Sequence, residues 1–193
     1  MVIGFIGSGS MAAALARGLG GLLDGMLFSD SGSGRAAALA AELGGEALAN
    51  EEVARRADAL VLAVKPAALE AVAPSLQEAG EIVSVLAATP LARLRAAFPD
   101  ATVLRTMPNV GVEVRKGVIC VAGDDPSPAV AEALEQIAHV VAIEEEDFDG
   151  ATAVMGCAPA YLALAVEAIA DAGAKDGLDP ELARELIVET TAG

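Results

Sequence analysis

Two glycines near the start of the chain have the spacing that a bound diphosphate requires. Gly7 and Gly9 open the pattern Gly-x-Gly-x-x-Ala, which Ala12 completes directly after a short apolar run. In this pattern the first glycine allows a tight turn off a strand, the second lets a phosphate approach the backbone, and the small third residue lets a helix pack closely on the sheet. The N–H groups at the start of that helix would face the phosphates. The residues expected to form this dinucleotide site are Gly7, Ser8, Gly9, Ser10 and Met11.

Polar residues about 20 positions further on give conflicting indications of which dinucleotide binds. Asp30 stands where a carboxylate would accept hydrogen bonds from a ribose 2′-hydroxyl, which favours NAD. Ser29, Ser31, Ser33 and Arg35 could instead hold a 2′-phosphate, which favours NADP. An ordinary turn rich in serine and glycine is the alternative. The sequence leaves NADPH and NADH open and favours NADPH weakly.

Two later segments are expected to end strands at the same edge of the sheet, where ligands collect in such folds. Lys65, in Val-Lys-Pro, is placed to meet a phosphate, a ribose or a substrate carboxylate, unless it is a plain surface lysine. Asn109 offers donors and acceptors that suit a carboxamide, and Met107 with Pro108 would form an apolar floor. A turn built around Pro-Asn is the alternative. The further residues expected in the cofactor site are Ser29, Asp30, Ser31, Arg35, Asn50, Ala63, Val64, Lys65, Pro66, Met107, Pro108 and Asn109.

Lys65, Asn109 and Tyr161 are the candidate catalytic residues. Tyr161, the single tyrosine, could donate a proton or simply pack near the start of a helix. His139 is the single histidine, and a structural or solvated role is favoured because no partner is in view. Cys120 and Cys157 lie outside any Cys/His cluster, so neither a metal site nor a disulfide framework is expected.

The composition narrows the function classes. The chain has 193 residues, a formal net charge of −16 and 54% hydrophobic residues. Such acidity disfavours nucleic acid and anionic membranes as partners. We expect a cytoplasmic location, because the N-terminus does not resemble a signal peptide and no apolar segment approaches the roughly 20 residues of a membrane span.

Alternating apolar runs and helical patterns predict an α/β fold, a Rossmann-like doubly wound parallel sheet. The expected strands are 2–6, 26–29, 59–64, 82–86, 102–105, 118–122 and 140–143. The expected helices between them are 10–19, 34–43, 51–56, 67–78, 91–97 and 127–138. After about residue 144 the strand signals stop, and a short all-helical C-terminal segment follows, interrupted at 156–159. We therefore expect a dinucleotide-binding domain at 1–150 and a helical dimerisation segment at 151–193, too small to form its own core.

These pieces, in this order, resemble the Δ1-pyrroline-5-carboxylate reductases, which make proline. The matching blocks are Gly4-Phe5-Ile6-Gly7-x-Gly9-x-Met11, Ala63-Val64-Lys65-Pro66, Arg105-x-Met107-Pro108-Asn109, Pro159-Ala160-Tyr161, Glu167-Ala168-x-Ala170-Asp171-Ala172-Gly173 and Gly177-Leu178. The resemblance implies hydride transfer from NAD(P)H to the C=N bond of a cyclic imino acid. It also implies a homodimer or higher homo-oligomer, with an interlocked helical region that contributes to the pocket.

The chain departs from that family at several positions. It has Val110-Gly111 where the family has Thr-Pro, Cys157-Ala158 where the family has Ser-Gly, and Ala87-Ala88-Thr89 where the family has Ala-Ala-Gly. A family stretch that binds the substrate carboxylate would lie beyond Gly193, so we expect either a truncated sequence or a homologue without it. Two alternatives stay open, a cofactor-binding but catalytically impaired paralogue and a related NAD(P)- or F420-dependent dehydrogenase. The 3-hydroxyacid type of dehydrogenase predicts a catalytic lysine on the long helix, and 159–172 contains none.

Overall fold

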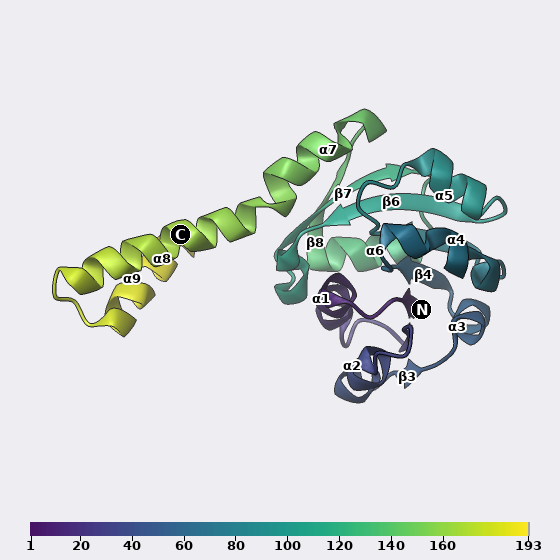
Figure 1. Ribbon diagram of the computed structural model, residues 1–193, viewed down its shortest axis with the longest axis horizontal. Helices are drawn as coiled ribbons and strands as arrows, with labels where there is room; N and C mark the ends of the chain where they lie inside the picture. The colour runs from purple at the N-terminus through teal and green to yellow at the C-terminus, as the bar shows by residue number, and fades with distance from the viewer. Residues whose placement is uncertain (193) are drawn as a thin grey trace.

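Eight strands form one sheet in the order β3-β2-β1-β4-β5-β6-β7-β8 in the computed structural model, which describes residues 1–192 (Figure 1). The strands are β1 Val2–Ile6, β2 Gly25–Ser29, β3 Glu46–Ala47, β4 Ala59–Leu62, β5 Glu81–Ser84, β6 Thr102–Pro108, β7 Gly117–Gly123 and β8 Ala138–Ala142. All neighbouring pairs are parallel except β6 and β7. The predicted Rossmann-like α/β fold is confirmed.

Helices cover both faces of this sheet, and each face has its own core. The helices of the sheet domain are α1 Ser10–Leu19, α2 Arg35–Leu43, α3 Asn50–Arg56, η1 Pro66–Ala68, α4 Leu69–Val72, η2 Ala73–Leu76, α5 Leu91–Ala97, η3 Val110–Val114 and α6 Pro128–Ile137. Apolar side chains of α1, α2 and α6 form one buried cluster with the sheet, in which the rings of Phe5 and Phe28 stack 5.1 Å apart. Side chains of α3, α4, η2 and α5 form the other. This two-sided burial explains why the strands have continuous apolar runs.

Three expectations about the sheet domain need correction. β7 runs antiparallel to β6, because the connection after Pro108 is shorter than the dozen or so residues that a parallel crossover needs. The two-residue edge strand β3 was not expected, since its residues are exposed and carry no apolar pattern. The single helix expected over 67–78 is divided into η1, α4 and η2; Pro74, at the start of η2, has no N–H to continue the α-helical ladder.

A helical arm projects from the sheet domain after β8 (Figure 1). Its elements are η4 Glu145–Asp147, α7 Phe148–Ala151, η5 Thr152–Gly156, α8 Ala158–Lys175 and α9 Pro180–Ala192. The α-helix is interrupted by the π-helical turn η5 and by Cys157, which overlaps the interruption expected at 156–159. Helical structure nevertheless runs almost continuously from residue 145 to residue 175. On length and composition alone this stretch, Glu145–Lys175, could span a membrane, which corrects the expectation that no apolar segment is long enough.

Candidate functional site

The predicted cofactor-binding turn follows β1, at the point in the sheet where the order of the strands reverses direction. β1 pairs with β2 on one side and with β4 on the other, while α1 and α3 lie on opposite faces. In doubly wound sheets a ligand crevice opens at this point, outside the carboxyl ends of the strands. The amide of Ala63, just after β4, donates to the carbonyl of Ile6 at 2.8 Å, so the predicted segments after β1 and β4 adjoin.

The two glycines of the turn have different structural roles. Gly7 has a φ of +93°, and a Cβ added there would lie 2.7 Å from the carbonyl oxygen of Ala63. Only glycine fits that close approach without strain. A Cβ added at Gly9 would meet nothing within 4 Å in the described part of the chain. Gly9 is also the residue before α1, so a phosphate close to its backbone would lie near the helix N-terminus, where free N–H groups would stabilise it.

An open cleft of about 680 Å³ begins at this turn and runs between α1 and α2. It brings together five of the predicted cofactor residues, which are Ser8, Gly9, Ser10, Met11 and Arg35. It also contains Arg17, which was not expected and whose guanidinium contacts Glu42 at 2.7 Å and Glu113 at 3.0 Å. These carboxylates raise the pKa of Arg17. No sequence signal singles out Arg17, because one exposed arginine on a helix is common and its partners are distant in sequence.

The predicted ribose ligand, Asp30, is occupied by its own loop. One carboxylate oxygen accepts hydrogen bonds from the amides of Gly32 and Ser33 at 2.7 and 3.1 Å. The other accepts from the Ser33 hydroxyl at 2.8 Å and the Ala36 amide at 2.9 Å. These bonds, the Ala36 amide first among them, lower the pKa of Asp30 to about 2. A carboxylate accepts about four hydrogen bonds, so Asp30 has little acceptor capacity left for a ribose.

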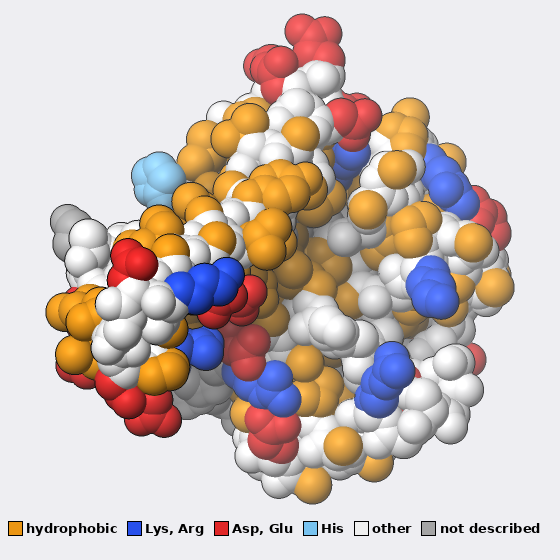
Figure 2. Space-filling model, turned by 60° about the vertical axis from the view of Figure 1, so that its left-hand side comes forward, with side chains coloured by type: hydrophobic (Ala, Val, Ile, Leu, Met, Phe, Trp, Pro, Cys, Tyr) orange, Lys and Arg blue, Asp and Glu red, His pale blue; other side chains and the backbone are white. Residues whose placement is uncertain are grey.

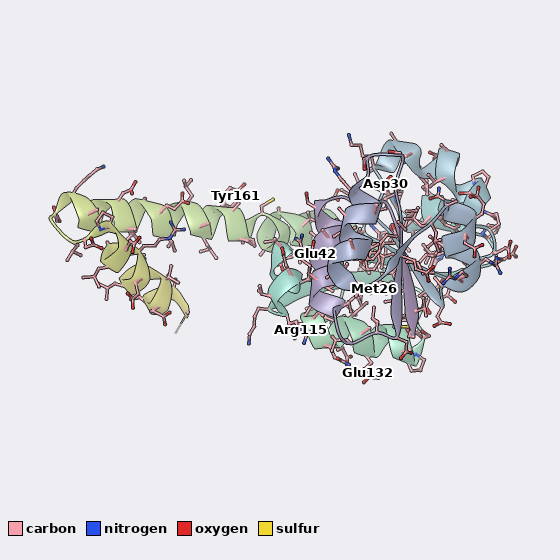
Figure 3. The ribbon with its side chains drawn as sticks, turned by 90° about the horizontal axis from the view of Figure 1, so that it is seen from below. Met26, Asp30, Glu42, Arg115, Glu132 and Tyr161 are labelled. Atoms are coloured by element: carbon pink, nitrogen blue, oxygen red, sulfur yellow. The ribbon has the colours of Figure 1, made fainter. Side chains whose placement is uncertain are left out.

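Two predicted serines also bond within the protein. The buried hydroxyl of Ser8 donates to the carbonyl of Ser29 at 3.0 Å, and the hydroxyl of Ser29 donates to the carbonyl of Phe5 at 3.3 Å. These bonds fasten the ends of β1 and β2 beneath the cleft. Ser31 lies on the loop that contains Asp30 (labelled in Figure 3), and Arg35 is the first residue of α2. Both are exposed, so their side chains remain available to a ligand.

The remaining predicted cofactor residues lie along neighbouring strand ends. Lys65 is exposed between β4 and η1, Val64 and Pro66 beside it are half-buried, and Asn50 is half-buried at the start of α3. At the end of β6, Met107 is half-buried and Pro108 is buried.

The amide of Asn109 is engaged on both sides. Its Oδ1 accepts hydrogen bonds from the amides of Gly111 at 3.2 Å and Val118 at 3.1 Å. Its Nδ2 donates to the carbonyl of Met155 in the arm at 3.2 Å, which leaves one N–H of the amide for a ligand.

Tyr161, the third candidate catalytic residue, lies on the arm rather than in the sheet domain (Figure 3). Its side chain is 68% exposed. It is therefore accessible to solvent or to a partner that packs against the arm. Among the described residues there is no group of three or more His, Cys, Asp or Glu side chains arranged to hold a metal ion.

Two family models match the chain, one over each region. Residues 2–88 match the family described as NADP oxidoreductase coenzyme F420-dependent, and residues 145–193 match the pyrroline-5-carboxylate reductase dimerisation family. The second match accounts for the exposed apolar helices of the arm as a surface for self-association.

Similar proteins have the same organisation. A pyrroline-5-carboxylate reductase of Pseudomonas aeruginosa is 37% identical over 99% of this chain and 76% of its own length. One of Synechocystis is 36% identical over 75% of this chain, in an alignment that spans 57% of its own length. The solved pyrroline carboxylate reductase of Plasmodium falciparum with NADP bound superposes with a TM-score of 0.87 at 26% identity, covering all of this chain and 76% of that one.

Proposed function

The chain belongs to the pyrroline-5-carboxylate reductase family, and from that premise we propose that it transfers a hydride from NADPH or NADH to the C=N bond of 1-pyrroline-5-carboxylate, giving L-proline. The observation that carries this proposal is the open side of Gly9 at the start of α1, at one end of a cleft of about 680 Å³. Similarity to relatives that bear this name along nearly the whole chain supports it.

The residues of the cleft fit a dinucleotide. The turn Gly7–Met11 would hold the diphosphate by its backbone N–H groups and by the positive end of α1. The exposed loop after β2 would hold the adenosine ribose, and the segments Ala63–Pro66 and Met107–Asn109 would border the nicotinamide. When bound, the reduced nicotinamide supplies the hydride.

The protein's own residues would mainly bind and orient the substrate. A cyclic imine is readily protonated in water, so the reaction needs little acid catalysis and depends on holding the two reacting carbons together. The ammonium group of Lys65 would attract the substrate carboxylate, and the free N–H of Asn109 would orient the nicotinamide amide. Met107 and Pro108 would exclude water from one side. Tyr161 lies on the arm, so its side chain would reach a cofactor cleft only in an assembly of two or more copies of the chain.

The loop after β2 favours NADPH over NADH. The carboxylate of Asp30 already accepts four hydrogen bonds from nearby residues, while the side chains of Ser31 and Arg35 are exposed beside it. An arginine that faces a 2′-phosphate forms a charge-assisted, bidentate interaction. We therefore expect Arg35→Ala to weaken NADPH binding about tenfold and NADH binding less than twofold.

The matched control for that experiment is Arg55→Ala, which removes an exposed arginine paired with Glu52 on α3, away from the cleft. It should change neither dissociation constant. Equal weakening of NADPH and NADH by Arg35→Ala would remove the assignment of the 2′-phosphate to this loop.

The arm supports self-association, and the chain forms homo-oligomers of the kind its dimerisation family describes. We propose that the basic unit is a homodimer in the cytoplasm, with residues 1–150 binding the dinucleotide and residues 151–193 joining the two copies. The assay that tests the function follows NADPH oxidation at increasing concentrations of the imine. Saturable, proline-forming turnover is expected. Tight NADPH binding without turnover would instead favour the catalytically impaired paralogue.

A further inference from the structure

Strand β6 holds the base of the arm at two points, four residues apart. At the first, Arg105 is only 5% exposed, and its guanidinium donates to Oε1 of Glu145 at 2.8 Å. The same guanidinium lies over the ring of Phe148, 4.2 Å from its centre. Glu145 and Phe148 belong to η4 and α7, so one strand residue contacts both of the first two elements of the arm.

The carboxylate at this first point serves two partners. Oε1 of Glu145 accepts a hydrogen bond from the amide of Leu91 at 2.6 Å as well as from Arg105. Leu91 is the first residue of α5, and amides at a helix start have no partner within the helix. Glu145 therefore ties the arm to both β6 and α5.

The second point follows from a proline in the arm. Pro159 has no N–H to donate to the carbonyl of Met155, four residues earlier. That carbonyl accepts a hydrogen bond from Nδ2 of Asn109 at 3.2 Å. Oδ1 of Asn109 meanwhile fixes the turn between β6 and β7 through Gly111 and Val118. The π-helical turn, which contains Met155, thus forms the second contact between the arm and the sheet domain.

The contact of Arg105 with Glu145 and Phe148 fixes the orientation of the arm more than it stabilises the fold. The Nε of Arg105 is buried with no hydrogen-bond partner among the described residues, which costs free energy. In the Arg105–Glu145 pair only the arginine is buried, while the glutamate side chain is 37% exposed. Such an ion pair adds little net stability, because desolvation of the buried charge and screening by solvent offset the attraction. It does define one geometry, because the planar guanidinium must meet both a carboxylate and an aromatic face.

The two points enclose Met107 and Pro108, which lie on β6 between Arg105 and Asn109. This strand end is where the proposed function places the nicotinamide. The arm beyond it carries exposed apolar side chains within the region that matches the dimerisation family. The angle at which the arm leaves the strand therefore decides where a second copy sits relative to the cleft.

We propose that Arg105 and Asn109 are positioning residues that hold the arm base, residues 145–155, against β6 and so place the second copy of the chain correctly over the cleft. The proposal rests on the proposed function for its kinetic consequence alone. A loosened arm base leaves the diphosphate turn intact, so cofactor binding stays the same while the reacting carbons lose their alignment.

The experiment compares Arg105→Met and Glu145→Gln, singly and together, with wild type. Arg95→Met is the matched control. Arg95 also pairs with a carboxylate, Asp124, which accepts a hydrogen bond from the amide of Val103. Neither residue forms a hydrogen bond with the arm among the described residues. Three quantities are measured, namely the NADPH dissociation constant, kcat and KM for the imine, and amide hydrogen exchange in residues 145–156.

For Arg105→Met we expect kcat to fall about tenfold or more, the NADPH dissociation constant to stay within about twofold, and exchange in 145–156 to quicken. Glu145→Gln should show the same pattern more weakly, since an amide oxygen still accepts both hydrogen bonds. The double variant should be no slower than Arg105→Met, because both changes break one contact. Arg105→Lys, which keeps the charge, should recover part of kcat.

Several outcomes would overturn the proposal. They are an unchanged kcat in Arg105→Met, an equal loss of NADPH binding, or an equal effect of Arg95→Met. If Arg105→Met does not fold, Glu145→Gln carries the test with the same readouts. If wild type has no imine reductase activity, the proposed function fails. Hydrogen exchange still tests whether Arg105 holds the arm base against β6. Unchanged exchange in 145–156 would then refute it.

Discussion

The sheet domain and the arm treat apolar side chains in opposite ways. In the sheet domain, large apolar residues form two buried clusters, one on each face of the sheet. In the arm, no described residue of α8 is buried, and α9 buries only Ala183. Leu162, Leu164 and Ile169 are each more than half exposed. Figure 2 shows hydrophobic side chains, in orange, gathered along the arm.

The comparison teaches that one apolar composition can make a core in one region and an interface in the other. A contiguous apolar surface of this kind is uncommon on a monomer and marks a binding site. The sheet domain has the layers it needs to fold alone, whereas two helices cannot bury each other completely. The arm therefore depends on another copy, consistent with the dimerisation family that it matches.

The largest expected effect comes from charging the arm. Leu164→Glu combined with Ile169→Glu should weaken self-association more than 100-fold, because each carboxylate would lose its hydration in an apolar interface. Sedimentation velocity over a range of concentrations measures this. Val114→Glu is the control, since Val114 is 69% exposed but belongs to the sheet domain. Unchanged assembly of the arm variant would show that another surface joins the copies.

The next effect separates the two glycines of the turn. Gly9→Val should weaken NADPH binding at least tenfold and barely change the free energy of unfolding, because its Cβ has open space on the protein side. Gly7→Ala should lower the free energy of unfolding by about 2 kcal/mol, because its Cβ would meet the carbonyl of Ala63 at a positive φ. Titration calorimetry and urea denaturation distinguish the two. Similar losses of stability in both variants would contradict this division of roles.

The smallest effect concerns backbone strain in the loop that follows β5. Ala88 has a φ of +50° in the loop between β5 and α5. Left-handed backbone costs alanine roughly 1–2 kcal/mol, and glycine loses roughly 0.5–1 kcal/mol through its greater freedom when unfolded. Ala88→Gly should therefore stabilise the sheet domain by about 0.5 kcal/mol in urea denaturation. A loss of stability would contradict the backbone strain assigned to Ala88.

Much of the sheet domain could be predicted from local sequence. Helix 91–97 and strand 2–6 were expected at the residues where they are observed, since each has an apolar period and clear ends. The antiparallel β7 was missed although its short connection signals it. The different roles of Gly7 and Gly9 could also be predicted, because in this spacing the first glycine allows a tight turn and the second lets a phosphate approach the backbone.

Two kinds of contact could not be predicted, those within a folded loop and those between distant segments. Asp30 is as suited to a ribose as to its own loop, and only the folded turn shows that the loop occupies it. Arg105 stood out only as part of a block that resembles the family, yet it contacts Glu145 and Phe148, about 40 residues further on. No periodicity or motif encodes such pairs, because they depend on how the arm leaves the sheet. The roles of the predicted site residues remain predictions, which the variants described above would test.

The transfer of deuterium from C4 of labelled NADPH tests the central claim most directly. The purified protein is incubated with 1-pyrroline-5-carboxylate and with NADPH that carries deuterium on the transferable face. The account predicts proline with one deuterium on the carbon that formed the C=N bond, at the rate at which NADPH is oxidised. Unlabelled proline, or bound NADPH that is never oxidised in the presence of the imine, would contradict it.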